Sequence, residues 1–194
     1  MQDVAKALAW VAGHIAEYGG NPEEVFIMGH SAGAHLAALV ATDGRRLAAE
    51  GRDLPLIKGI ILLDGACYDI PAEYRLPPMK EMIETAFGTD PQVWKDASPV
   101  SHIKPGVKYP AFLIAYATGR VAARFQAERL AGRLKDAGCA ARVVPVEVAA
   151  NDGVRGPLEQ HLLINARFGL PDDPLTQQSM QFLDSIRRAT AARR

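Results

Sequence analysis

The 194-residue sequence has no excess of charge of either sign and no long apolar run. Lysine plus arginine number 22, as do aspartate plus glutamate. No long-range field therefore exists to attract nucleic acid, an anionic membrane or a strongly acidic substrate. No apolar stretch approaches the roughly 20 residues of a membrane-spanning helix, and residues 1–18 carry charges where a signal peptide has its apolar core. We expect a soluble, cytoplasmic protein whose partner is a small neutral molecule.

Cysteine is also scarce. Cys67 and Cys139 lie far apart in the chain, and neither has a companion His or Cys at the spacing of metal ligands. Two cysteines cannot build a disulfide framework, which agrees with a reducing compartment. We expect both thiols to be idle and the protein to need neither a metal ion nor an organic cofactor.

Helical and strand patterns alternate along the chain, whose composition is 48% hydrophobic and 23% charged. This order predicts an α/β fold, with a parallel sheet of about four strands and helices placed alternately on its two faces. Strands are predicted at 25–28, 57–63, 109–117 and 141–148, and helices at 3–18, 31–42, 125–137 and 174–188. An excursion at 64–108 interrupts the pattern and contains a short helix near 78–87. Its large side chains fill core or cover a pocket, and we favour core for Tyr68, Tyr74, Met79, Met82 and Trp94.

A G-x-S-x-G motif, Gly29-His30-Ser31-Ala32-Gly33, lies between the first strand and an alanine-rich helix. This strand-to-helix context is what a nucleophile elbow requires, because the tight turn presents the serine hydroxyl clear of the sheet. The following helix directs its N-terminal N–H groups at a developing oxyanion, and the N–H of Ala32 would be one donor. The alternative is that the glycines only allow close packing and that Ser31 is a helix N-cap.

A serine nucleophile needs a base from later in the chain, and five histidines are candidates. His161 follows the fourth strand by a loop and can therefore reach the sheet edge where the elbow points. His14 belongs to the first helix and His102 to the excursion, while His30 and His35 are too near the serine to reach round to it. The alternative for His161 is a surface residue that caps the next helix.

Two long segments resemble one branch of a known family. GGNPEEVFIMGHSAGAHLAALV is similar to the nucleophile region of the esterase and arylformamidase-like α/β-hydrolases, and QHLLINARFGLPDDPLTQQSMQFL to their catalytic-histidine segment. LLDGACYDI and the segment 97–99 also look like this family. The resemblance implies a serine hydrolase that cleaves a small carboxylic ester or related acyl compound through an acyl-enzyme. It covers the C-terminal part of the fold only.

The acid of the triad is not where the resemblance places it. The family usually takes this Asp from just after the third strand, where the sequence has Gly119 or Arg120. We expect Asp64, at the end of the second strand, to replace it. Glu147 and Asp152 near the end of the fourth strand are alternatives, and the remaining alternative is that the chain has no such acid.

The front of the fold is also missing, because only 30 residues precede the serine and no His-Gly-Gly occurs anywhere. We expect one N-terminally incomplete domain over 1–194, lacking a second oxyanion donor worth about 3–4 kcal/mol. Its first strand would have an unpaired edge, which predicts a homodimer through that edge. The rival hypothesis is a catalytically impaired relative that acts as a binding module. A nucleotide-binding domain is disfavoured, since no phosphate-loop pattern follows the first strand.

Overall fold

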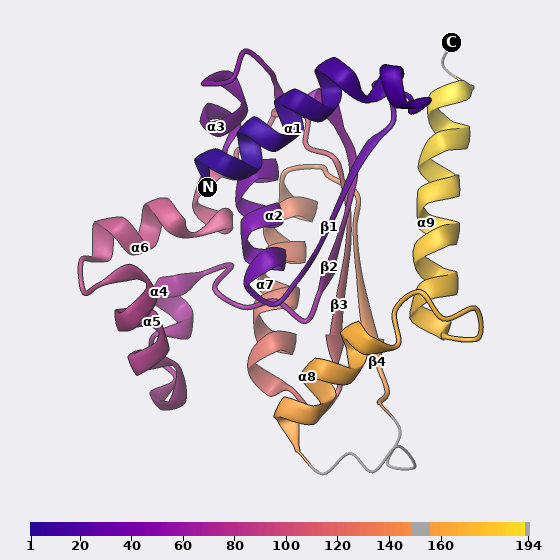
Figure 1. The fold of residues 1–194 in the computed structure, drawn as a ribbon. Helices are drawn as coiled ribbons and strands as arrows, with labels where there is room; N and C mark the ends of the chain where they lie inside the picture. Colours follow the sequence, from indigo (N-terminus) through magenta and orange to yellow (C-terminus); the bar gives the residue numbers. More distant parts are fainter. Residues whose placement is uncertain (149–155, 193–194) are drawn as a thin grey trace.

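The computed structural model describes residues 1–148 and 156–192. At its centre lies a parallel sheet whose four strands are in sequence order (Figure 1). The strands are β1 (Val25–His30), β2 (Ile57–Leu63), β3 (Ala111–Ala117) and β4 (Ala141–Val146). The prediction of a four-stranded parallel sheet flanked by helices is confirmed.

Helices cover both faces of the sheet. Their bounds are α1 (Gln2–His14), α2 (Ala32–Thr42), α3 (Gly44–Ala48), α4 (Ile70–Glu73), α5 (Lys80–Phe87), α6 (Pro91–Ala97), α7 (Val121–Asp136), α8 (Pro157–Ala166) and α9 (Pro174–Ala191). Alternate residues of β2 face opposite layers: Ile60 and Leu62 pack with α2 and α7, and Ile61 and Leu63 pack with α8 and α9. The sheet is therefore buried on both sides, as its nearly continuous apolar strands require.

The predicted alternation of helices between the two faces is wrong. The helices α1, α2 and α7 lie on one face, and α9 lies on the other (Figure 1). The helix α8 lies at the carboxyl ends of the strands, and its Ile164 packs in the cluster on the α9 side. The strand order explains the difference, because each new strand is added on the same side of the last one. Right-handed crossovers in one direction keep their connecting helices on one face.

Several element boundaries also differ from the prediction. The strand β3 begins at Ala111, directly after Pro110, which has no N–H to donate to a ladder. The helix α7 begins at Val121, one turn earlier than predicted. The largest difference concerns the segment around His161, which forms the helix α8 where no helix was predicted.

The excursion 64–108 forms a small helical layer with a core of its own. Cys67, Ile70, Ile83 and Trp94 are buried together, and Tyr74 and Met79 pack against them. Tyr68 belongs to the main core instead, and Met82 is 43% exposed. The interpretation of these large side chains as core is therefore right for four of the five named above and wrong for Met82.

The strand β1 lies at one edge of the sheet. Within the described residues only β2 pairs with it, and Met28 near its end is 51% exposed. No helix in this part of the chain is long and apolar enough to cross a membrane.

Candidate active site

Ser31 occupies a strained turn between β1 and α2. Its φ of 57° and ψ of −123° lie in a region that L-residues rarely adopt. A side chain at Gly29 would place its Cβ 2.3 Å from the carbonyl oxygen of Gly33, so the first glycine of the motif is required by packing. A Cβ at Gly33 would meet no atom within 4 Å, so packing does not explain the second glycine. The Ser31 N–H donates to the carbonyl of Leu63 on β2 at 3.0 Å, which ties the turn to the sheet.

The structure brings His161 to this turn. Its Nε2 lies 3.0 Å from Ser31 Oγ, and its Nδ1 lies 2.6 Å from Asp64 Oδ2. A carboxylate only accepts hydrogen bonds, so Nδ1 carries the proton and donates to Asp64. Nε2 is then free to accept the hydroxyl proton of Ser31. Serine, imidazole and carboxylate thus form one hydrogen-bonded chain, with the geometry of a nucleophile and an oriented base.

Asp64 lies directly after β2 and has no solvent-exposed side-chain surface. Its φ is 45°, and its N–H donates to the carbonyl of Ala115 on β3 at 2.8 Å. The second carboxylate oxygen, Oδ1, accepts the N–H of Ala117 at 3.1 Å. Both hydrogen bonds come from β3, so this strand holds Asp64 in place beside the serine that follows β1.

The other acids considered from the sequence do not lie in this chain of contacts. Glu147 is exposed and lines a hollow between the end of β4 and α9, and Asp152 falls outside the described residues. Where the family resemblance leads to an expected Asp, the chain has Arg120, whose Nε is 2.6 Å from Asp64 Oδ2. No local pattern in the sequence marks this ion pair, because 56 positions separate the partners.

His30 is a second residue of the site that sequence reasoning dismissed. Its Nε2 donates to the backbone carbonyl of His161 at 2.9 Å, and the two rings lie 4.4 Å apart between centroids. Burial lowers the pKa of His30 below its ordinary value, although the hydrogen bond to that carbonyl acts in the opposite direction. A neutral ring that donates from Nε2 fits these contacts. His30 is too near Ser31 in sequence to reach round to its hydroxyl, but it contacts His161, whose Nε2 lies 3.0 Å from that hydroxyl.

Ala32 opens α2 immediately after the serine. As the first residue of the helix, its N–H has no acceptor within the helix. This donor and the positive end of the helix dipole lie beside the serine, where negative charge develops when a carbonyl is attacked.

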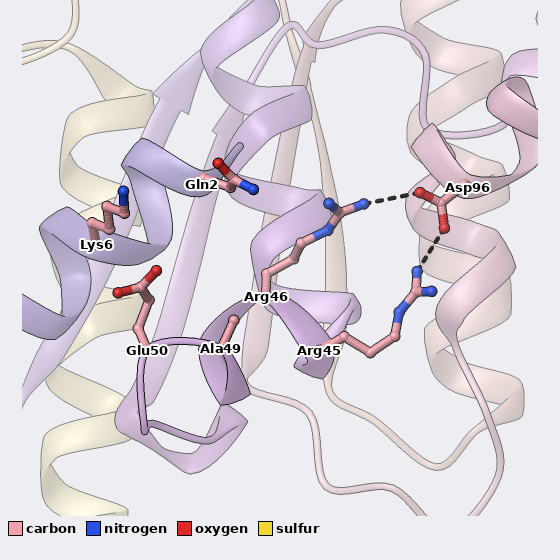
Figure 2. Close-up of a pocket in the computed structure, with 7 residues that line it drawn as sticks. All are labelled: Gln2, Lys6, Arg45, Arg46, Ala49, Glu50 and Asp96. Carbon is pink, nitrogen blue, oxygen red and sulfur yellow. Dashed lines mark hydrogen bonds and ion pairs between the residues drawn. The ribbon is translucent and has the colours of Figure 1, made fainter.

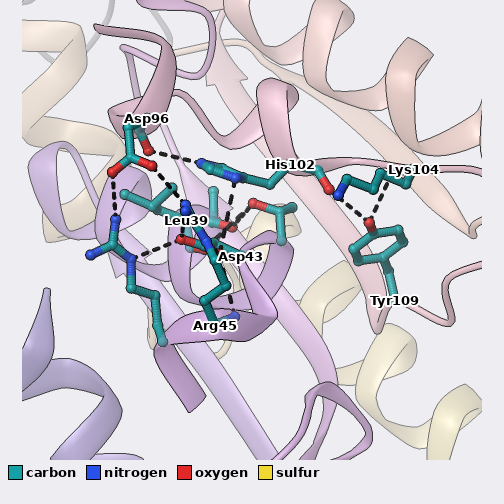
Figure 3. A network of polar contacts seen from close by, with 10 residues as sticks. Leu39, Asp43, Arg45, Asp96, His102, Lys104 and Tyr109 are labelled. Carbon is teal, nitrogen blue, oxygen red and sulfur yellow. Dashed lines mark hydrogen bonds and ion pairs between the residues drawn. The ribbon is translucent and has the colours of Figure 1, made fainter. Parts of the chain in front are cut away.

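A second polar cluster joins the far end of α2 to the excursion. Asp43 is 2% exposed and accepts from Nε of Arg45 at 2.7 Å and of Arg46 at 2.8 Å. Both guanidinium groups also bond to Asp96 of α6, and His102 Nε2 donates to the Asp96 carbonyl at 2.8 Å (Figure 3). The charges of this cluster compensate one another, so it acts as a structural tie.

An adjoining surface hollow is shown in Figure 2; it is lined by Gln2, Lys6, Arg45, Arg46, Ala49, Glu50 and Asp96. It lies at the opposite end of α2 from the serine turn and contains none of the residues of the candidate site. Among the residues that the structure describes, no group of three or more His, Cys, Asp or Glu side chains could hold a metal ion.

Comparison with known proteins points to esterases. A model of the carboxylesterase family matches residues 1–80. Esterase LipQ of Mycobacterium tuberculosis is 31% identical over 153 residues, which is 71% of this chain and 34% of LipQ. The chain thus spans about a third of the length of this relative.

Solved structures agree on the fold. Esterase B from Lactobacillus rhamnosis superposes on this chain with a TM-score of 0.72. The superposition covers 97% of this chain and 61% of esterase B, and the two sequences are 18% identical. Esterase 2 of Thermogutta terrifontis, in a form phosphonylated by sarin, is 29% identical over 76% of this chain and 54% of its own, with a TM-score of 0.58.

Proposed function

The chain belongs to the α/β-hydrolases and is related to their carboxylesterase family, and from this premise we propose that it hydrolyses a small, neutral carboxylic ester through an acyl-enzyme. One observation carries the proposal: the continuous contact from Ser31 Oγ through both nitrogens of His161 to Asp64, at 3.0 and 2.6 Å. The organophosphorus adduct of the Thermogutta relative supports covalent chemistry at an activated nucleophile in this family.

In the proposed mechanism Ser31 Oγ attacks the ester carbonyl while His161 Nε2 accepts its proton. Asp64 holds the imidazole in the tautomer that can accept, and it stabilises the cation that forms. The N–H of Ala32 donates to the oxyanion of the tetrahedral intermediate. His161 then returns the proton to the leaving alcohol, and the acyl-enzyme remains on Ser31.

Deacylation repeats these steps with water as the nucleophile. His161 Nε2 removes a proton from the water, the hydroxide oxygen attacks the acyl carbon, and the proton returns to Ser31 Oγ as the acid leaves. No metal or organic cofactor takes part in this scheme. The equal numbers of acidic and basic residues in the chain give no preference for a charged substrate, which favours a neutral ester.

The direct test is labelling of the purified chain with a fluorophosphonate, followed by intact-mass measurement. We expect one adduct on the unmodified chain and none on Ser31→Ala, while Ser101→Ala, a change at an exposed serine of the excursion, should label normally. Asp64→Asn should slow labelling by about 10⁴-fold, because a neutral amide no longer selects the reactive tautomer. Absence of labelling on folded protein would refute the proposal and favour a binding module.

A further inference from the structure

The carboxylate of Asp64 has two cationic or potentially cationic neighbours. His161 Nδ1 and Arg120 Nε both lie 2.6 Å from the same oxygen, Oδ2. The carboxylate is fully buried, and an isolated anion in such a place is strongly disfavoured. Since a triad histidine is neutral before reaction, Arg120 is the group that compensates the charge of Asp64 in the resting site.

The contact between Arg120 and Asp64 is an electrostatic attraction more than a directed hydrogen bond. The Nε–H bond has no acceptor in hydrogen-bonding geometry among the described residues, although its nitrogen lies close to the carboxylate. Arg120 is also the N-cap of α7, where the helix dipole disfavours a positive charge. A cation is thus held at an unfavourable position on its own helix, in contact with the carboxylate of Asp64.

The turn that carries Arg120 also contacts the helix that carries the base. The N–H of Gly119 donates to Oε1 of Gln160, the residue before His161, at 3.0 Å. Arg120 makes a longer contact of 3.4 Å with the carbonyl of Pro157 at the start of α8. The segment 118–120 therefore touches both the acid and the backbone support of the histidine.

We infer that Arg120 is a positioning residue of the catalytic site, which keeps the buried Asp64 charged and aligned so that it can orient His161. This inference rests on the proposed function. Arg120 acts through Asp64 and does not contact the reacting atoms. Because the contact lacks directed hydrogen bonds, a lysine at the same position should supply most of the effect, since lysine carries a point charge.

The experiment measures kcat and KM with p-nitrophenyl acetate, and the rate of fluorophosphonate labelling, for Arg120→Gln and Arg120→Lys. The matched control is Arg124→Gln, which removes an exposed arginine of α7 that pairs with Glu128. We expect Arg120→Gln to lower kcat by about ten- to a hundredfold, the range found for outer-shell groups that support the ligands of a metal site, with little change in KM. Arg120→Lys should keep most of kcat, and Arg124→Gln should keep all of it.

A double-mutant cycle separates this role from general support of the fold. The Asp64→Asn background removes the carboxylate that Arg120 contacts, so Arg120→Gln should cause no further loss of labelling rate there. If Arg120→Gln alone fails to fold, the double variant removes both charges together and provides the same comparison with Asp64→Asn. Equal rates support the inference.

The inference would be overturned by losses that multiply in the cycle, by a lysine variant as slow as the glutamine variant, or by a loss confined to KM. If the wild type is labelled but Arg120→Gln has a normal kcat, this inference is refuted while the proposed function stands. A wild type that never labels would refute the proposed function, and the inference would fall with it.

Discussion

The buried carboxyl group of Glu73 provides the most quantitative prediction. Glu73 lies at the end of α4 with no exposed surface, and its Oε2 accepts the N–H of Cys67 at 2.6 Å. Its Oε1 has no hydrogen-bond partner among the described residues. Burial is the main reason that the pKa of Glu73 is raised from 4.5 to about 7. Near pH 8 the folded chain must therefore keep a charge in a place that favours the neutral acid.

The size of the effect follows from linkage. The pKa of about 7 exceeds the ordinary 4.5 by about 2.5, and each whole step corresponds to about 1.36 kcal/mol, which gives about 3 kcal/mol. A raised pKa means that the folded state binds the proton more tightly than the unfolded state does. The stabilising contribution of the neutral acid is thus complete below pH 4.5 and is lost as the pH rises towards and through 7.

The substitution that isolates this contribution is Glu73→Gln, which keeps an oxygen acceptor for the N–H of Cys67 but can carry no charge. We expect the free energy of unfolding of the two proteins to be similar at pH 5. At pH 8 the variant should be more stable by about 3 kcal/mol, which for a chain of this length raises Tm by roughly 6–12 °C.

Urea unfolding at pH 5 and pH 8, followed by circular dichroism, measures the difference directly. Contributions from all other titrating groups cancel when the variant is compared with the wild type at each pH. A variant that is equally destabilised at both values, or a difference that does not grow with pH, would refute the reasoning from burial.

Three further predictions follow from other contacts. His30→Leu should lower kcat by about tenfold while His30→Gln keeps most of it, because glutamine can donate to the His161 carbonyl and leucine cannot. Steady-state kinetics measure the difference, and an equal loss of kcat in both variants would contradict the prediction. Tyr68→Phe should raise the free energy of unfolding by about 1 kcal/mol in urea titrations, since the buried hydroxyl has no hydrogen-bond partner among the described residues. A loss of stability would show that the hydroxyl does form a hydrogen bond in the folded protein. We also propose that two copies associate through the open edge of β1. Sedimentation should then show a dimer, and Met28→Lys should weaken that dimer. A monomer at every concentration would exclude this association.

The sheet could be predicted from the sequence because its signals are local. Apolar runs such as 57–63 are bounded by turn residues, and the observed β2 has the predicted limits. The strand-to-helix context of Ser31 likewise needs only neighbouring residues to be recognised. The choice of Asp64 over two rival acids rested on one topological rule, that parallel strands end at the same edge of a sheet.

The contacts that sequence reasoning missed all depend on packing between distant segments. The helix α8 has little hydrophobic periodicity, and no helix was predicted there. Its large side chains Leu158 and Leu162 are exposed. The ion pair of Arg120 with Asp64 joins the ends of two adjacent strands, and no local pattern marks such a pair. The distribution of helices over the two faces depends on strand order, which the sequence of elements leaves open.

The hydrogen bond from Ser31 to Leu63 means that nucleophile and acid belong to one rigid body. Asp64 is the next residue after Leu63, so one strand spacing of about 4.8 Å sets their separation. The base arrives on a separate body, α8, in which Ile164 is the one buried side chain among the described residues. The alignment of His161 with Ser31 and Asp64 then depends on how one helix with little buried surface packs against the sheet. Heating should consequently abolish labelling by detaching this helix several degrees before the sheet itself melts.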